Sequence, residues 1–188
     1  MDQINAYLQD LQSAITALDP TAIAQVRDLV AEARDQGRQI FFCGNGGSAA
    51  TATHMTNDLG KGASYGRDAA ARFRVVSLAD NVPWMTALAN DVSYESIFAE
   101  QLENLGREGD LLIAISGSGN SENVLRAVAV ARRKGMKSVG LTGFDGGRLA
   151  GEADLAIVAD SHHMGRVEDI HAIILHAVCY NFMEEKAS

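Results

Sequence analysis

Apolar residues in the first 37 positions recur at the spacing of two amphipathic helices. Asp19 and Pro20 stand between the two apolar stripes, which predicts that a second helix starts there with Asp19 as its N-cap. We expect this second helix to end near Gly37. The residues that define the stripes are Ile4, Leu8, Leu11, Ile15 and Leu18 in the first helix, and Ile23, Val26, Leu29, Val30 and Ala33 in the second.

From residue 38 onward, short apolar runs alternate with helical stretches. This alternation indicates βαβ units, so we expect an α/β fold with a five-stranded, parallel, doubly wound sheet flanked by helices. We interpret 1–188 as one domain, with a helical pair at 1–37 and an α/β core at 38–188. The predicted strands are 39–43, 73–78, 110–115, 137–141 and 155–158, and the predicted helices are 48–59, 81–90, 94–105, 121–134 and 166–184.

Three local features lead to separate expectations. The polar, glycine-containing segment 60–72 predicts a mobile surface loop. Trp84, in the helix expected at 81–90, is predicted to belong to the core. Cys43 and Cys179 lie far apart without a CxxC pairing, which favours two buried free thiols in a reducing compartment.

Composition narrows the classes of function. The formal net charge is −8, whereas a nucleic-acid-binding protein would present a basic face, so we expect no nucleic-acid partner. The chain has no run of 18 apolar residues, and its first residues lack the basic and apolar regions of a secretory signal. We therefore expect a cytoplasmic protein that does not bind membranes.

Two loops of small residues each follow a predicted strand and lead into a predicted helix. The first is Gly-Asn-Gly-Gly-Ser at 44–48, and the second is Ser-Gly-Ser-Gly-Asn-Ser at 116–121. Free backbone N–H groups and the helix dipole make such a junction an anion site, and the three serines of the second loop suit a phosphate monoester. The alternative is a pair of ordinary turns that need glycine for positive φ. Neither loop matches the motifs of P-loop or dinucleotide-binding proteins.

Histidines and carboxylates recur on two of the predicted helices, 48–59 and 166–184. His54 and Asp58 are four residues apart, and Glu168 can share one broad helix face with His176. Such pairs form either a divalent metal site or a general acid/base pair. The alternatives are a surface pair for His54 and Asp58, and a buried, hydrogen-bonded His176. His171 fits either interpretation, and the adjacent His162 and His163 are expected to be solvated.

Four motifs together resemble the sugar isomerase (SIS) domain over nearly the whole chain. They are Cys-Gly-Asn-Gly-Gly-Ser-Ala-Ala at 43–50, Ala-Asn-Asp at 89–91, Ala-Ile-Ser-Gly-Ser-Gly-Asn-Ser at 114–121 and Leu-Thr-Gly-Phe-Asp-Gly-Gly at 141–147. Within this superfamily the chain is most similar to the phosphoheptose isomerases. Those enzymes interconvert sedoheptulose 7-phosphate and D-glycero-D-manno-heptose 7-phosphate.

The resemblance implies a homotetramer with active sites between subunits, a phosphate held by serines, and one zinc ion per site. The implied metal and catalytic positions are His54, Asp58, Glu168 and His176. The family usually has glutamate at the position of Asp58, glutamine at that of Glu168, and Ser-Thr-Ser in the second loop. The implied substrate-binding residues are Asn45, Gly46, Gly47, Ser48, Asp91, Ser116, Gly117, Ser118, Ser121 and Glu168.

These observations favour an aldose–ketose isomerase that moves a proton between C1 and C2 of a phosphorylated sugar through an enediol. Asp58 is assigned as the base and His176 as the acid/base partner on the opposite side of the sugar, although the two roles could be exchanged. One alternative is an isomerase of another sugar phosphate. The other is a non-catalytic SIS protein that binds a sugar phosphate or a protein partner, as the replication-initiator-associating protein does. Four intact metal-binding or proton-transferring positions favour an enzyme.

Overall fold

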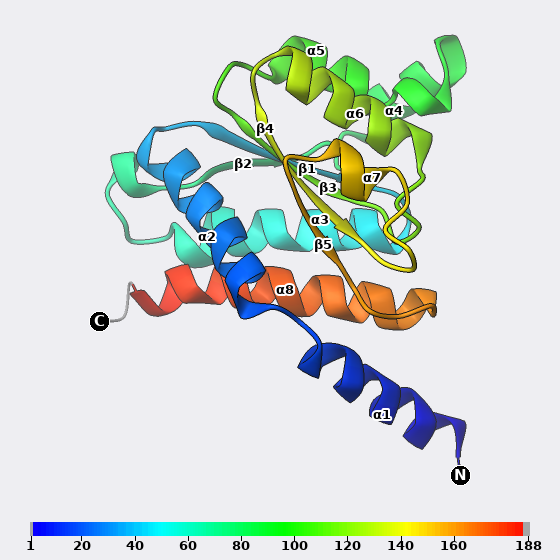
Figure 1. Cartoon of the computed structure of the whole chain (residues 1–188). Helices are drawn as coiled ribbons and strands as arrows, with labels where there is room; N and C mark the ends of the chain where they lie inside the picture. Colours follow the sequence, from blue (N-terminus) through cyan, green and yellow to red (C-terminus); the bar gives the residue numbers. More distant parts are fainter. Residues whose placement is uncertain (1, 186–188) are drawn as a thin grey trace.

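The computed structural model describes residues 2–185 and has a central sheet between two layers of helices (Figure 1). Within these residues the sheet has five strands, all parallel, in the order β2-β1-β3-β4-β5. The predicted fold class is therefore confirmed, and each predicted strand matches within one residue at either end. The strands are β1 (Gln39–Gly44), β2 (Arg74–Ser77), β3 (Leu111–Ile115), β4 (Lys137–Thr142) and β5 (Leu155–Val158).

The central strands β1 and β3 are apolar on both faces because each face is covered by helices. In β1, Ile40 and Phe42 point into the core formed with α2, α3 and α8, whereas Phe41 and Cys43 point into the core formed with α5 and α6. All four of these side chains are almost completely buried. The first layer contains α2 (Pro20–Asp35), α3 (Gly47–Asn57) and α8 (Met164–Glu185), and the second contains α4 (Val82–Asp91), α5 (Ala99–Leu105), α6 (Glu122–Arg133) and α7 (Leu149–Glu152).

Strand order places the two predicted loops side by side. The chain passes from β1 to β2 on one side, then crosses to β3 on the other side of β1. Such a reversal is a topological switch point, where the loops beyond the carboxyl ends of adjacent strands open a crevice. The loops 44–48 and 116–121 follow β1 and β3, which pair directly, so both loops flank this crevice.

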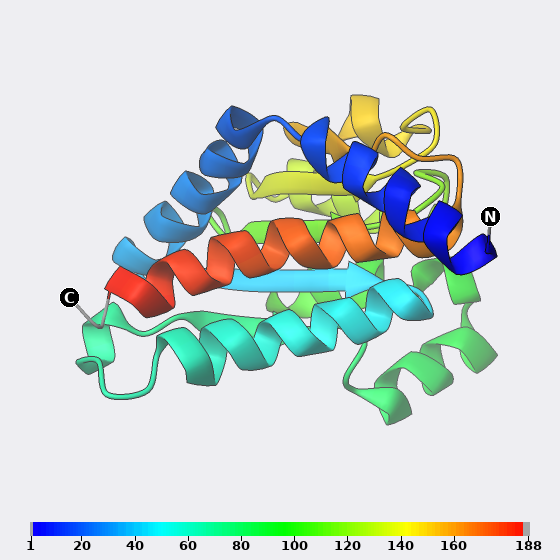
Figure 2. The same cartoon turned by 90° about the horizontal axis from the view of Figure 1, so that it is seen from below.

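The two leading helices have different surroundings. Helix α2 belongs to the main core, since Val26 and Val30 are fully buried. Helix α1 (Gln3–Thr16) lies along the outer side of α8 and extends away from the sheet, as Figures 1 and 2 show. Tyr7 donates a hydrogen bond to Asp169 of α8 at 2.5 Å, and its ring faces the guanidinium of Arg166. These contacts hold α1 against the first half of α8.

Three local expectations need correction. The segment predicted as a surface loop at 60–72 continues α3 as a π-helical turn (Asp58–Ala63), and a 3₁₀ turn (Ala69–Ala71) follows. Ser64 is buried and donates to the carbonyl of Leu59 at 2.7 Å, which fixes this stretch against the core. The helix expected at 94–105 is a 3₁₀ turn (Tyr94–Ser96) followed by α5. Trp84 is only partly buried, because α4 lies at the edge of the second layer.

A search of residues 2–185 finds no helix with the length and apolarity needed to span a lipid bilayer.

Candidate active site

The loop after β1 turns sharply into α3. Gly46 has φ +54°, a conformation that favours glycine, and Ser48 lies buried in the first turn. A β-carbon at Gly47 would collide with the carboxylate of Glu168, which therefore lies against the start of α3. A helix N-terminus stabilises a negative charge. The protein's own carboxylate thus faces the first of the two predicted anion sites.

Asn45 in the same loop is held by two partners from other parts of the chain. Its amide and that of Asn123 exchange two hydrogen bonds, each 2.8 Å long. The hydroxyl of Tyr94 donates to the same Asn45 carbonyl oxygen at 2.8 Å. Asn123 is almost fully buried in the first turn of α6. Sequence analysis missed Asn123 and Tyr94, although Asn123 stands just two residues after the serine loop.

The loop after β3 presents three serine hydroxyls at the start of α6. Ser116 donates to the hydroxyl of Ser121 at 3.0 Å, and the hydroxyl of Ser118 accepts the backbone N–H of Asn120 at 3.2 Å. Gly119 has φ +68°, and a β-carbon there would strike the backbone of Gly146. The side chain of Ser121, the N-cap residue, makes no capping bond to α6. The helix start is therefore not closed by its own N-cap side chain.

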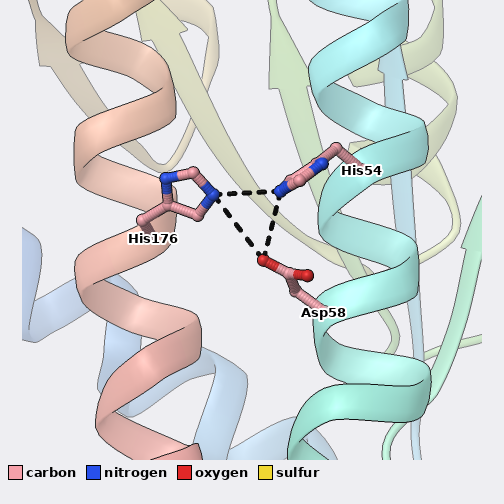
Figure 3. Close-up of side chains that lie close together, drawn as sticks. All are labelled: His54, Asp58 and His176. Carbon is pink, nitrogen blue, oxygen red and sulfur yellow. Dashed lines mark hydrogen bonds and ion pairs between the residues drawn. The ribbon is translucent and has the colours of Figure 1, made fainter.

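His54, Asp58 and His176 meet between α3 and α8 (Figure 3). The Nε2 atoms of the two histidines lie 3.0 Å apart. Asp58 Oδ2 lies 3.4 Å from His54 Nε2 and 3.7 Å from His176 Nε2. The three ligand atoms all fall within 4.8 Å of one another, which is the arrangement that a metal ion needs.

The chemistry of this group also fits a cation. Asp58 Oδ2 is buried, and it has no hydrogen-bond partner among the described residues. A carboxylate oxygen without a hydrogen bond is costly to bury, and a divalent ion would compensate it. Asp58 opens the π-helical turn that follows α3, and such turns occur often at functional sites.

Two buried sulfur-containing side chains, Cys179 and Met55, lie beside the three-residue group. The thiol of Cys179 donates to the sulfur of Met55 at 3.8 Å, and both side chains are buried. Burial, with a contribution from the charge of Asp58, raises the pKa of Cys179 to about 12. The thiol therefore stays protonated at neutral pH, and it acts as a neutral neighbour of the group. On the outer side, His54 and His176 line a cavity of about 290 Å³.

The other predicted site residues are distributed around this centre. Glu168 is not part of the three-residue group, because its carboxylate lies against Gly47. Asp91 lies exposed at the end of α4 and accepts a hydrogen bond from Asn90 at 2.7 Å. His162 and His163 are exposed, as expected.

His171 is a buried structural histidine. The residue is 1% exposed, and its Nε2 lies 3.0 Å from the carbonyl oxygen of Thr142, at the end of β4. Burial lowers the pKa of this imidazole, so the neutral form is favoured. The face of α8 that carries His176 and the buried face that carries His171 are therefore distinct.

The distance between Asp58 and His176 bears on one geometric expectation. Asp58 and His176 were predicted to act from opposite sides of the sugar, but their nearest side-chain atoms lie 3.7 Å apart. A sugar carbon needs about 3.5 Å to each neighbour, so no carbon chain fits between these two atoms. The pair lies on one side of any bound sugar in this arrangement.

The fold and the site define a member of the SIS-domain class: the SIS domain family model matches residues 3–143. The chain is 37% identical to the phosphoheptose isomerase of Alteromonas mediterranea over 185 residues, which cover 95% of this chain and 92% of that protein. It belongs to the phosphoheptose isomerase family, a family of aldose–ketose isomerases.

Solved structures agree with this assignment. A phosphoheptose isomerase from Francisella tularensis superimposes with a TM-score of 0.91 at 31% identity, with 97% of each chain covered. The phosphoheptose isomerase GmhA from Neisseria gonorrhoeae gives a TM-score of 0.86 at 30% identity, with 96% of each chain covered. The likeness therefore includes α1 as well as the α/β core.

Proposed function

We propose that this protein interconverts sedoheptulose 7-phosphate and D-glycero-D-manno-heptose 7-phosphate. The observation that carries the proposal is the convergence of His54, Asp58 and His176 beside a cavity, in a chain whose relatives are phosphoheptose isomerases. An aldose–ketose isomerisation moves one proton between C1 and C2 and another between the two oxygens. A carboxylate and an imidazole 3.7 Å apart suit these two transfers.

In this proposal Asp58 moves the carbon-bound proton and His176 moves the hydroxyl proton. His54, Asp58 and His176 would also hold one zinc ion, because two imidazoles and a carboxylate form a ligand set found in catalytic zinc sites. Asp58 and His176 would transfer protons only while their proton-accepting atoms are not bound to the ion. Zinc bound there supplies a Lewis acid for the sugar carbonyl. The burial of Asp58 Oδ2 without a hydrogen-bond partner in the described chain supports this assignment.

The phosphate is proposed to bind at the loop 116–121. Ser116, Ser118 and Ser121 supply hydroxyl donors there, with Ser48 from the first loop and the N–H groups of α6. The loop 44–48 is a poorer phosphate site, because the carboxylate of Glu168 lies against Gly47. The proposed sugar-binding residues are Asn45, Gly46, Gly47, Asp91, Gly117 and Glu168.

A homotetramer is proposed on the basis of the exposed apolar stripe of α1. Ile4, Leu8 and Ile15 are 66%, 56% and 41% exposed, although α1 is anchored to α8 on its other side. A row of exposed aliphatic side chains on an anchored helix suits burial against another subunit.

The test is incubation of the purified protein with sedoheptulose 7-phosphate in D₂O, with and without added zinc, followed by NMR. The expected result is aldose carrying deuterium at C2, formed faster with zinc. The absence of both product and proton exchange would contradict the heptose assignment. A panel of pentose and hexose phosphates then distinguishes an isomerase of another sugar from a protein that only binds.

A further inference from the structure

A second polar cavity opens at the opposite end of the sheet, where the strands begin. It has a volume of about 310 Å³, and Gln39 at the start of β1 and Arg74 at the start of β2 are among its lining residues. The two small-residue loops follow the carboxyl ends of the strands. Since a six-residue strand such as β1 is about 20 Å long, this cavity is separate from the candidate active site.

Three arginines line this cavity. Arg38 donates to the carbonyl of Glu108 and Arg74 to the carbonyl of Gly37, both at 2.9 Å. Arg107 uses its backbone N–H in a hydrogen bond, and its side chain forms no hydrogen bond with any residue of 2–185. Within residues 2–185, none of the three guanidinium groups forms an ion pair. Backbone carbonyls orient two of the cations but do not neutralise them.

The carboxylate of Asp110, which lines the cavity, already accepts two backbone hydrogen bonds. Asp110 is 4% exposed, and its two oxygens accept the backbone N–H groups of Gln39 at 2.8 Å and Arg107 at 2.9 Å. It therefore accepts backbone hydrogen bonds next to the start of β3. The three arginines and Asp110, the four ionisable lining residues, together carry a formal charge of +2. In addition, Arg38 Nε is buried without a hydrogen-bond partner in the described part of the chain. This local positive charge is notable in a chain of net charge −8.

The cavity also has an apolar side. Val76 on β2 and Leu105 at the end of α5 line it, and they are 36% and 40% exposed. A ligand that covered them would gain from apolar burial as well as from charge. The cavity thus pairs several guanidinium groups with an adjacent aliphatic wall.

We propose that this cavity binds an organic phosphate, with its phosphate on Arg38, Arg74 and Arg107 and its apolar portion against Val76 and Leu105. Guanidinium groups match phosphate oxygens in geometry, and three of them suit a dianion better than a carboxylate monoanion. The ligand would bind at the amino ends of the strands, so it would not compete for the serine loop at the carboxyl ends.

The test uses phenyl phosphate as the probe, because it joins a phosphate to an apolar ring. Binding is measured by isothermal titration calorimetry with the full-length protein, Arg74→Ala/Arg107→Ala, and the control Arg72→Ala. Arg72 is an exposed arginine outside the cavity that likewise donates to a backbone carbonyl. Arg107→Ala alone is a further variant, because it removes a side chain without a hydrogen bond in the described structure. Circular dichroism checks that each variant is folded.

We expect the Kd for phenyl phosphate to rise at least about tenfold in Arg74→Ala/Arg107→Ala, to rise by a smaller factor in Arg107→Ala, and to stay unchanged in Arg72→Ala. Ser118→Ala separates this binding from binding at the catalytic loop, and it should retain the arginine-dependent component. Equal Kd values for the double variant and Arg72→Ala would overturn the proposal. Loss of all phenyl phosphate binding in Ser118→Ala would overturn it as well.

Discussion

The amides of Asn45 and Asn123 form a reciprocal pair with two 2.8 Å hydrogen bonds, and this pair connects the loop after β1 to the start of α6. The relationship depends on the pairing of β1 with β3, because these strands bring the two loops together. It gives Asn45 a defined orientation beside the crevice. Asn123 is therefore a positioning residue for a side chain proposed to contact the sugar.

Replacing Asn123 with alanine should reduce both stability and activity. The change leaves the partly buried amide of Asn45 with Tyr94 as its remaining described partner, and losing a hydrogen bond of this kind costs about 1 kcal/mol. We expect kcat/KM for the sugar phosphate to fall at least about tenfold, mainly through KM. Steady-state kinetics and urea denaturation measure the two effects.

Tyr94→Phe and Asn104→Ala are the matched variants for this test. Tyr94→Phe removes one donor to Asn45 and should have a smaller effect, whereas Asn104 is exposed on α5 and its loss should be neutral. Wild-type kinetics in Asn123→Ala would show that the pair does not position Asn45.

Metal binding should depend on Asp58 and far less on Glu168. Asp58 belongs to the three-residue group, so Asp58→Asn should weaken zinc binding by at least about 100-fold, more than the loss of an outer-sphere partner costs. Glu168→Gln keeps the shape of the side chain, and the carboxylate it replaces lies against Gly47 rather than in the group. The zinc content after dialysis against a chelator measures how much zinc each of the two variants retains. A large loss of zinc in Glu168→Gln would make Glu168 a ligand.

The strands were predictable from the sequence, whereas the segment after α3 was not. The central strands β1 and β3 are buried on both faces and therefore read as continuous apolar runs with turn residues at their ends. In contrast, Gly60 and Gly62 give the π-helical turn the composition of a loop. The burial of Leu59 and Ala63 comes from packing against the core, which composition does not show.

The candidate site likewise has a part that the sequence predicts and a part that depends on tertiary packing. The i,i+4 spacing of His54 and Asp58 is a property of one helix, so the sequence was enough to pair them. The 3.0 Å contact between His54 and His176 depends on α8 packing beside α3. The spacing of residues along the sequence therefore did not predict this contact, nor that His54, Asp58 and His176 form a single group. The meeting of Asn123 with Asn45 likewise depends on strand order.

The two cysteines should be unreactive in the folded protein. Burial raises the pKa of Cys43 and of Cys179 to about 12, so at pH 8 each holds about 10³-fold less thiolate than a free cysteine. A thiol reagent such as DTNB should react at once in denaturant and very slowly without it. Ala129→Cys, at an exposed position of α6, is the positive control. Rapid native labelling of two thiols in the parent protein would contradict the burial.

Disrupting the apolar stripe of α1 should lower the oligomeric state. Leu8 is 56% exposed, and placing a charge there removes about 1–1.5 kcal/mol of apolar burial for each copy in an interface. Leu8→Glu should therefore shift the mass measured by light scattering toward smaller species. Gln9→Glu adds the same charge at an exposed polar neighbour and should leave the mass unchanged. A monomeric parent protein would remove the tetramer from the proposal.

Stability should decrease as the pH falls, and His171 should contribute to this decrease. Burial lowers the pKa of His171 in the folded state, whereas an unfolded histidine titrates near pH 6.5. Below about pH 6.5 the unfolded state therefore binds more protons, and the free energy of unfolding falls by up to about 1.4 kcal/mol per pH unit. The contribution is fully present above pH 6.5 and is lost as the pH drops through the lowered pKa.

Urea denaturation at pH 8.0 and 5.5 tests this prediction with a pair of variants. His171→Gln removes the titrating group, so this variant should lose less stability than the parent between the two pH values, even if it is less stable at both. His162→Gln changes an exposed histidine and should keep the parent's pH dependence. If His171→Gln and the parent lose the same free energy, the buried imidazole does not contribute to the acid sensitivity.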